Sequence, residues 1–134
     1  MTVKQSPGGS NFPYYYKGGE LFGLHLGCFG SNEEGVIALM KAEELFYTSQ
    51  NHTVGGLWID FYQTKLTERV IGEFIGFFKQ VRPRILKLAL VGCSGIDRLK
   101  INRLIKKTKS LSSIPVKYFA DPEDAKTWLV NEME

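Results

Sequence analysis

Cysteine and histidine are scarce in this chain, and their scarcity limits the chemistry it can carry. There are two of each among 134 residues: Cys28, Cys93, His25 and His52. Two cysteines are too few for a disulfide framework and suit a reducing compartment. His25 and Cys28 are the only soft metal ligands close together in the sequence, but residues three apart on a strand face opposite sides of the sheet. We therefore expect no metal site and no cofactor.

Long apolar runs are also missing. None approaches the roughly 20 residues that are needed to span a bilayer. The N-terminus, MTVKQSPGGSNFP, lacks the charged-then-apolar order of a signal peptide. We therefore expect a cytoplasmic protein with no membrane span. The hydrophobic content of 43% and the charged content of 23% are those of an ordinary globular domain.

Acidic residues are almost absent from one stretch of the chain. Between Arg82 and Lys109 there are nine basic residues against one acidic residue, Asp97, which gives this stretch a net charge of +8. The rest of the chain has eight basic and 13 acidic residues, a net charge of −5. Such an asymmetry favours an acidic partner. Nucleic-acid binding is not expected, because no recognised binding motif is present and the pI is only moderately high.

Turn-forming residues divide the N-terminal part. Residues 1–11 centre on SPGGS, a composition typical of a flexible segment, so we place the domain at residues 12–134. The stretch FPYYYKGGELFGLHLGCF then predicts two strands joined in a hairpin at Gly18 and Gly19. A glycine pair tolerates positive φ at both positions of a tight turn.

The remainder alternates between helices and apolar strands. Helix starts are predicted by N-cap residues, namely Ser31 in the capping box SNEE, Thr67, Ser94 and Asp121. The strands are GGLWIDF, ILKLALVG and IPVKYFA, which have the apolar character of a buried parallel sheet. The order ββαβαβαβα predicts a single α/β domain with a mainly parallel five-stranded sheet and an N-terminal β-hairpin.

Two of the helices have predicted inward and outward sides. The first runs to about Ser49, with these residues inward: Val36, Ile37, Met40, Leu45 and Phe46. The helix after Ser94 buries a stripe that includes Ile101, Leu104 and Ile105. Its outward side is expected to carry the basic residues Arg98, Lys100, Arg103, Lys106 and Lys107.

The stretch ALVGCSGIDRLK places a thiol and a hydroxyl after a strand, where open α/β sheets usually bind ligands. Arg98 follows Cys93 one position too early for the phosphatase loop, and GCSG is not the Gly-x-Ser-x-Gly elbow of hydrolases. A nucleophile also needs a base. We therefore expect Cys93 to be a small buried residue, and Ser94 to be a helix N-cap with Asp97 in the first turn.

Other polar residues lie near the ends of the first long strand and the central strand. Asp60 ends GLWID and is expected to accept hydrogen bonds from loop amides. Tyr62, Thr64 and Thr67 follow it, and the two threonines are interpreted as a loop residue and a cap. His25 shares a strand face with Gly23 and Gly27, a pattern that indicates close helix packing or a small ligand groove.

With this order of elements, the chain resembles the STAS domain, the fold of the bacterial anti-sigma-factor antagonists. The resemblance covers roughly residues 12–132 and rests on the hairpin, GGLWIDF, LKLALVG and VKYFADPEDAKTWL. It implies a small regulatory or binding module, which meets its partners at the loop before the second helix. In phospho-switched members, Asp-Ser/Thr-x-Gly begins that helix. The stretch DFYQTKLTERV lacks the motif, so a phosphorylation switch at Thr64 or Thr67 is not implied.

We therefore expect a non-enzymatic regulatory or protein-binding module whose partner is an acidic protein. The first alternative is a domain that binds a small anion or apolar molecule with the loops at the strand C-termini, and the second is a cryptic enzyme centred on Cys93. The patterns leave the oligomeric state open, a homodimer included. The candidate contact residues are Asp60, Tyr62, Thr64, Thr67, Cys93, Ser94, Arg98, Arg103, Lys106 and Lys107.

Overall fold

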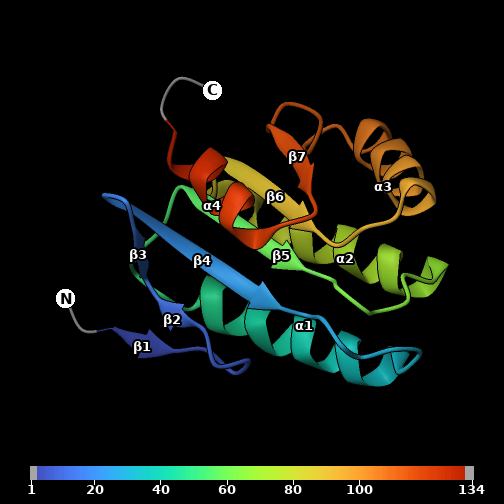
Figure 1. Cartoon of the computed structure of the whole chain (residues 1–134), viewed down its shortest axis with the longest axis horizontal. Helices are drawn as coiled ribbons and strands as arrows, with labels where there is room; N and C mark the ends of the chain where they lie inside the picture. The colour runs from blue at the N-terminus through green and yellow to red at the C-terminus, as the bar shows by residue number, and fades with distance from the viewer. Residues whose placement is uncertain (1–2, 132–134) are drawn as a thin grey trace.

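A five-stranded sheet forms the centre of the structure, a computed structural model that describes residues 3–131 (Figure 1). Its strand order is β3-β4-β5-β6-β7; β3 is antiparallel to β4, and all other neighbours are parallel. This confirms the predicted single α/β domain with a mainly parallel sheet and an N-terminal hairpin. The strands are β3 (Tyr14–Tyr16), β4 (Gly19–His25), β5 (Gly56–Asp60), β6 (Lys87–Val91) and β7 (Val116–Phe119).

Helices cover the two faces of the sheet unequally (Figure 1). One face packs its core residues, such as Phe22 and Ile59, against helices α1, α2 and α3. The other face packs Leu21 and Trp58 against α4. The helices are α1 (Glu33–Thr48), α2 (Glu68–Val81), α3 (Gly95–Lys107) and α4 (Pro122–Val130), with a short 3₁₀ helix, η1 (Arg82–Arg84), after α2.

Helix α1 differs from the prediction at its start and on its inward side. Its N-cap is Asn32, whose Oδ1 accepts a hydrogen bond from the Gly35 amide at 3.0 Å, and not Ser31. Leu45 is exposed, while Glu43 and Tyr47 are buried. The buried positions recur every three or four residues along the helix, so the stripe passes through Glu43 and leaves Leu45 on the opposite side.

The turn between β3 and β4 lies one residue earlier than predicted. Lys17 and Gly18 have φ values of 46° and 85°, and Tyr16 pairs with Gly19. Gly19 is therefore a strand residue. A Cβ at Gly19 would lie 2.6 Å from Cγ1 of Val130, so this glycine makes room for α4 and is not needed for the turn.

Residues 4–12, most of which belong to the segment predicted to be flexible, form a small hairpin. β1 (Lys4–Gln5) pairs antiparallel with β2 (Asn11–Phe12). The carboxylate of Glu43 holds the turn between them: its Oε2 accepts hydrogen bonds from Ser6 Oγ at 2.9 Å and from the Gly8 amide at 3.1 Å. A buried side chain 35 residues away therefore orders the segment.

Candidate functional site

The loops after β4, β5 and β6 meet at one edge of the sheet, as parallel strands require. Backbone hydrogen bonds continue the sheet past the strand ends, with Leu26 N donating to Asp60 O at 2.9 Å and Phe61 N to Val91 O at 2.9 Å. Two glycines enclose the backbone of Tyr62. A Cβ at Gly27 would lie 2.8 Å from Tyr62 O, and one at Gly92 would lie 2.8 Å from Tyr62 N.

The polar residues of the β5 loop hold that loop in place. Asp60 Oδ1 accepts a hydrogen bond from Tyr62 N at 2.9 Å, the loop-amide contact expected from the sequence. Thr64 Oγ1 donates to Leu26 O at 2.6 Å and accepts from Phe29 N at 3.1 Å, which joins the loop to the segment after β4. The ring of Tyr62 is exposed, so it is free to contact a partner.

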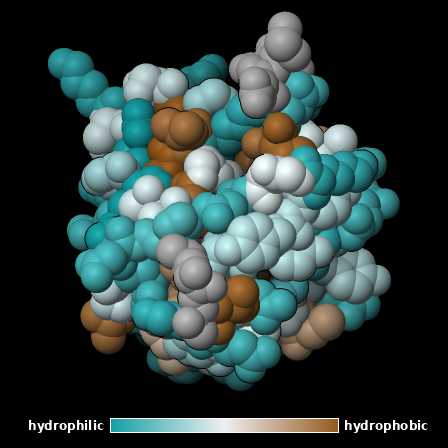
Figure 2. Space-filling model, turned by 90° about the vertical axis from the view of Figure 1, so that its left-hand side faces the viewer, coloured by the Kyte–Doolittle hydropathy of each residue, from teal (hydrophilic) through white to brown (hydrophobic). Residues whose placement is uncertain are grey.

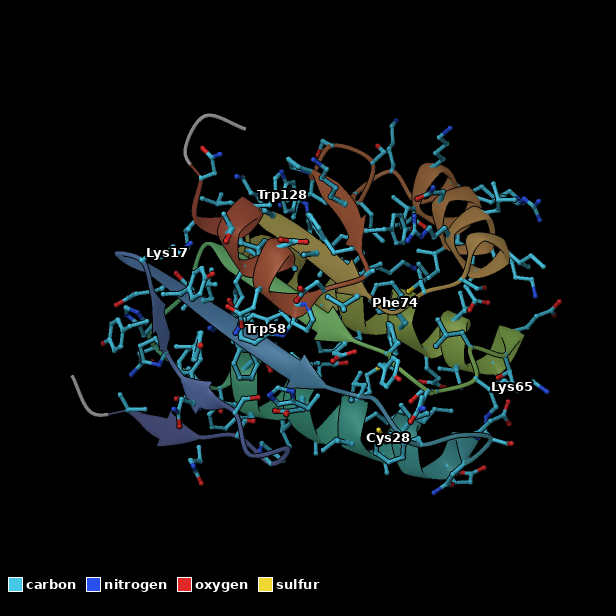
Figure 3. All side chains as sticks on the ribbon, in the orientation of Figure 1. Lys17, Cys28, Trp58, Lys65, Phe74 and Trp128 are labelled. Atoms are coloured by element: carbon cyan, nitrogen blue, oxygen red, sulfur yellow. The ribbon has the colours of Figure 1, made fainter. Side chains whose placement is uncertain are left out.

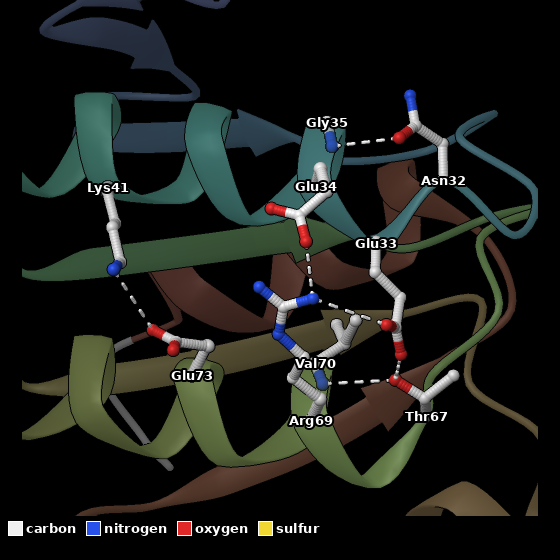
Figure 4. Close-up of polar contacts among 9 residues, drawn as sticks. All are labelled: Asn32, Glu33, Glu34, Gly35, Lys41, Thr67, Arg69, Val70 and Glu73. Atoms are coloured by element: carbon white, nitrogen blue, oxygen red, sulfur yellow. Dashed lines mark hydrogen bonds and ion pairs between the residues drawn. The ribbon is translucent and has the colours of Figure 1, made fainter.

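Thr67 connects the starts of α1 and α2 (Figure 4). As predicted, it caps α2: its Oγ1 accepts a hydrogen bond from Val70 N at 3.2 Å. The same hydroxyl donates to the carboxylate of Glu33. Arg69 pairs with Glu34 at 2.6 Å and with Glu33 at 3.5 Å, and the hydrogen bond and charge of Arg69 lower the pKa of Glu34. The arrangement gives Thr67 a structural role between the two helices.

The environment of Cys93 is the opposite of what a nucleophile needs. Burial, with a further contribution from the Asp97 carboxylate, raises the pKa of Cys93 to about 12, so the reactive thiolate is suppressed at neutral pH. Ser94 Oγ accepts a hydrogen bond from Asp97 N at 3.1 Å and caps α3, as predicted. Among residues 3–131 there is also no cluster of three metal-ligating side chains.

Arg98 does not lie on the outward side of α3, where it was predicted. Its Nε donates to Cys93 O at 3.3 Å, and its guanidinium carbon lies 5.3 Å from the ring centroid of Tyr118 on β7. Arg98 precedes Ile101 by three residues and Ile105 by seven, so it shares the inward side of the helix with these buried residues. The prediction failed because it grouped the basic residues by charge and not by helical position.

The outward side of α3 combines basic and aliphatic residues. Arg103, Lys106 and Lys107 are exposed, as expected. Ile96 and Leu99 are 67% and 66% exposed. Their exposure was not predicted, although their spacing from Arg103 indicates that the three residues share one side of the helix. We define the α3 surface as Ile96, Leu99, Lys100, Arg103, Lys106 and Lys107.

A groove between α2 and α3 adjoins the α3 surface. It has a volume of about 340 Å³. Its apolar part consists of Ile71 and Leu104, and its charged rim consists of Glu68, Lys100, Arg103 and Lys107. The end of the molecule at the left of Figure 1, which Figure 2 turns toward the viewer, is mostly hydrophilic, with apolar residues in small separate patches.

These features define a small α/β domain with a basic, partly aliphatic helix on its surface. No family model matches the chain, and the comparisons with curated proteins and with solved structures found no match either. Within residues 3–131, none of the helices has the length and apolar character that crossing a membrane requires.

Proposed function

We propose that this chain is a non-enzymatic protein-binding module of the STAS type, and that its α3 surface recruits an acidic protein. The observation that carries the proposal is the exposure of Ile96 and Leu99 beside the basic residues of the same helix side. Aliphatic side chains with most of their surface in water lose that contact when a partner covers them, which favours association.

Charge supports an acidic partner. The stretch from Arg82 to Lys109 carries +8 and the rest of the chain −5, so the field around α3 attracts negative charge. The single acidic residue of this stretch, Asp97, lies in the first turn of α3, and its amide is the one that Ser94 caps. Opposite charges speed the encounter and orient the partner, while the buried aliphatic contacts slow its release.

The shape of the surface suits an amphipathic acidic segment. The apolar side chains of such a partner segment would cover Ile96 and Leu99, and the carboxylates of the segment would face Arg103 and Lys107 along the rim of the groove. Tyr62, on the neighbouring loop, adds an exposed aromatic ring of the kind that is enriched in protein interfaces. The raised pKa of Cys93 argues against the alternative of an enzyme centred on that thiol.

The test compares proteins captured from cell extract by three forms of the chain. The α3 variant combines Arg103→Glu, Lys106→Glu and Lys107→Glu. The matched control combines Lys17→Glu, Lys79→Glu and Lys117→Glu, which makes the same change in net charge at exposed positions on a turn, on α2 and on β7.

The proposal predicts an acidic protein that the wild type and the control capture and the α3 variant loses. Covalent cross-linking of that protein, followed by peptide mapping, should place it on α3 or the Tyr62 loop. Equal capture by all three forms, with each folded by circular dichroism, would make the basic residues of α3 an ordinary solvated surface.

A further inference from the structure

A second cavity lies on the opposite face of the sheet, beside β4 and under α4. Its volume is about 250 Å³. Its lining comes from the β1–β2 hairpin, from strands β3, β4 and β5, and from helix α4. The cavity shares no residue with the α3 surface. The side chains that line it are Ser10, Asn11, Tyr14, His25, Trp58 and Lys126.

The indole of Trp58 is buried, but its polar atom lacks a partner. Trp58 is 5% exposed, and within residues 3–131 no acceptor is hydrogen-bonded to its Nε1–H. The Nε1 atom is nevertheless not completely covered, and Trp58 is one of the residues that line the cavity. Figure 3 shows Trp58 between β4 and α4. Gly23 leaves the room for the ring, because a Cβ there would lie 2.2 Å from Cζ2 of Trp58.

The cavity also contains a largely buried cation. The side chain of Lys126 is 11% exposed, and its Nζ lies 5.0 Å from the ring centroid of Tyr14 and 5.3 Å from that of Trp58. Nζ pairs with Glu123 at 2.8 Å and donates to Tyr14 Oη at 3.3 Å. Burial opposes the charge, but these hydrogen bonds outweigh it and raise the pKa of Lys126, which therefore stays protonated.

Three hydrogen-bond donors of the residues that line this cavity have no acceptor among the described residues. An ammonium has three N–H groups, and in the described part of the chain two of those of Lys126 have acceptors. The Tyr14 hydroxyl accepts from Lys126, and its own proton has no acceptor among the described residues. The Trp58 N–H is the third. A site with an excess of donors and a buried cation favours a ligand that is rich in acceptors and negatively charged.

We propose that this cavity binds a small organic carboxylate, whose oxygens accept hydrogen bonds from Trp58 Nε1, Tyr14 Oη and Lys126 Nζ. A monoanion is preferred to a phosphate dianion, because the carboxylate of Glu123 already lies beside the ammonium and repels additional negative charge. The site is independent of the proposed protein partner, so either proposal can fail without the other.

The experiment follows the indole N–H signals of the full chain by two-dimensional ¹H–¹⁵N NMR. The chain has two tryptophans, and a Trp128→Phe variant assigns the Trp58 signal. The probes are acetate and benzoate, with acetamide and benzamide as neutral controls of similar shape and inorganic phosphate as the dianion.

The carboxylates should shift the Trp58 signal to saturation, whereas the amides should not shift it and phosphate should bind more weakly. Lys126→Gln should weaken carboxylate binding about tenfold, as expected for a lost charge-assisted hydrogen bond. The matched control Lys117→Gln removes an exposed lysine on β7 and should leave binding unchanged.

A second variant guards against misfolding of Lys126→Gln. Trp58→Phe keeps a ring over Gly23 but removes the N–H, and it should weaken the carboxylate-induced shifts of the Ser10 and Asn11 amides. If carboxylates do not shift the Trp58 indole signal, or if the amides shift it equally, the proposal is wrong and this is a water-filled cavity.

Discussion

Replacing Gly23 with alanine should destabilise the fold, although alanine is normally the better residue in a strand. The new Cβ would lie 2.2, 2.4 and 2.5 Å from three atoms of the Trp58 indole, whereas carbon atoms in contact prefer about 3.5–4.0 Å. The ring would have to move by about 1 Å or more. It is 5% exposed and enclosed by Tyr14, at 5.4 Å between ring centroids, and by Lys126.

The size of the effect follows from two opposing contributions. Overpacking a well-packed site costs about 1–3 kcal/mol, while exchanging glycine for alanine in a strand returns about 0.5–1 kcal/mol. Because three indole atoms would lie within 2.5 Å of the added Cβ, the cost should be in the upper part of its range, about 2–3 kcal/mol, and we expect the free energy of unfolding to fall by about 1–2.5 kcal/mol. Gly72→Ala is the matched control: Gly72 lies in α2 with no atom within 4 Å of its added Cβ, so this variant should gain about 0.5–1 kcal/mol.

Urea unfolding followed by far-ultraviolet circular dichroism measures both changes without relying on tryptophan emission. The two glycine variants should move the unfolding midpoint in opposite directions. A Gly23→Ala protein as stable as the wild type would refute the reasoning, because it would mean that the indole does not lie over this strand.

Three other expectations concern single side chains. Ser94→Ala should cost about 0.5–2 kcal/mol through the lost α3 cap and leave partner capture intact, as urea unfolding and the capture assay would show. In the native state at neutral pH, a thiol reagent should label exposed Cys28 well before Cys93, whose pKa burial raises to about 12; rapid labelling of Cys93 would contradict the assigned burial. Burial also raises the pKa of Glu43 above its ordinary 4.5. The folded protein therefore binds this proton more tightly than the unfolded chain, and the resulting stabilisation is complete below pH 4.5 and is lost as pH rises through the raised pKa. Glu43→Gln should therefore gain stability relative to the wild type as pH rises from about 4 to 7, and a difference that is independent of pH would contradict this.

The features that the sequence predicted correctly depend on short-range interactions. The caps at Thr67, Ser94 and Asp121 each bond a backbone amide two or three residues ahead, so neighbouring residues suffice to identify them. The buried positions Ile101 and Ile105 of α3 are equally local, because residues four apart lie on the same side of a helix.

The features that were missed depend on residues far apart in the chain. The order of the β1–β2 hairpin comes from Glu43, a charged residue on the buried side of α1 that a pattern of apolar residues alone does not identify. The inward position of Arg98 on α3 is completed by the Tyr118 ring, which lies 20 residues away on β7. The cavity beside Trp58 is formed jointly by the β1–β2 hairpin, by strands β3, β4 and β5, and by α4. In the sequence, only the shared strand face of Gly23 and His25 indicated a groove there.

The aliphatic part of the α3 surface can be tested separately from its charge. Leu99→Ser removes an exposed side chain without changing net charge, so it should leave the association rate of the captured partner nearly unchanged and raise its dissociation rate. Surface plasmon resonance measures both rates. An unchanged dissociation rate would show that the partner does not cover Leu99.

The association rate of that partner as a function of salt tests the central claim most directly. Raising the ionic strength from about 0.01 M to about 1 M shortens the Debye length from about 30 Å to about 3 Å and removes long-range attraction. At low salt, the variant with Arg103→Glu, Lys106→Glu and Lys107→Glu should associate at least tenfold more slowly than the wild type, and the two rates should converge at high salt. The control with Lys17→Glu, Lys79→Glu and Lys117→Glu should stay much closer to the wild type throughout. Equal rates for all three proteins at every salt concentration would contradict recruitment of an acidic partner by α3.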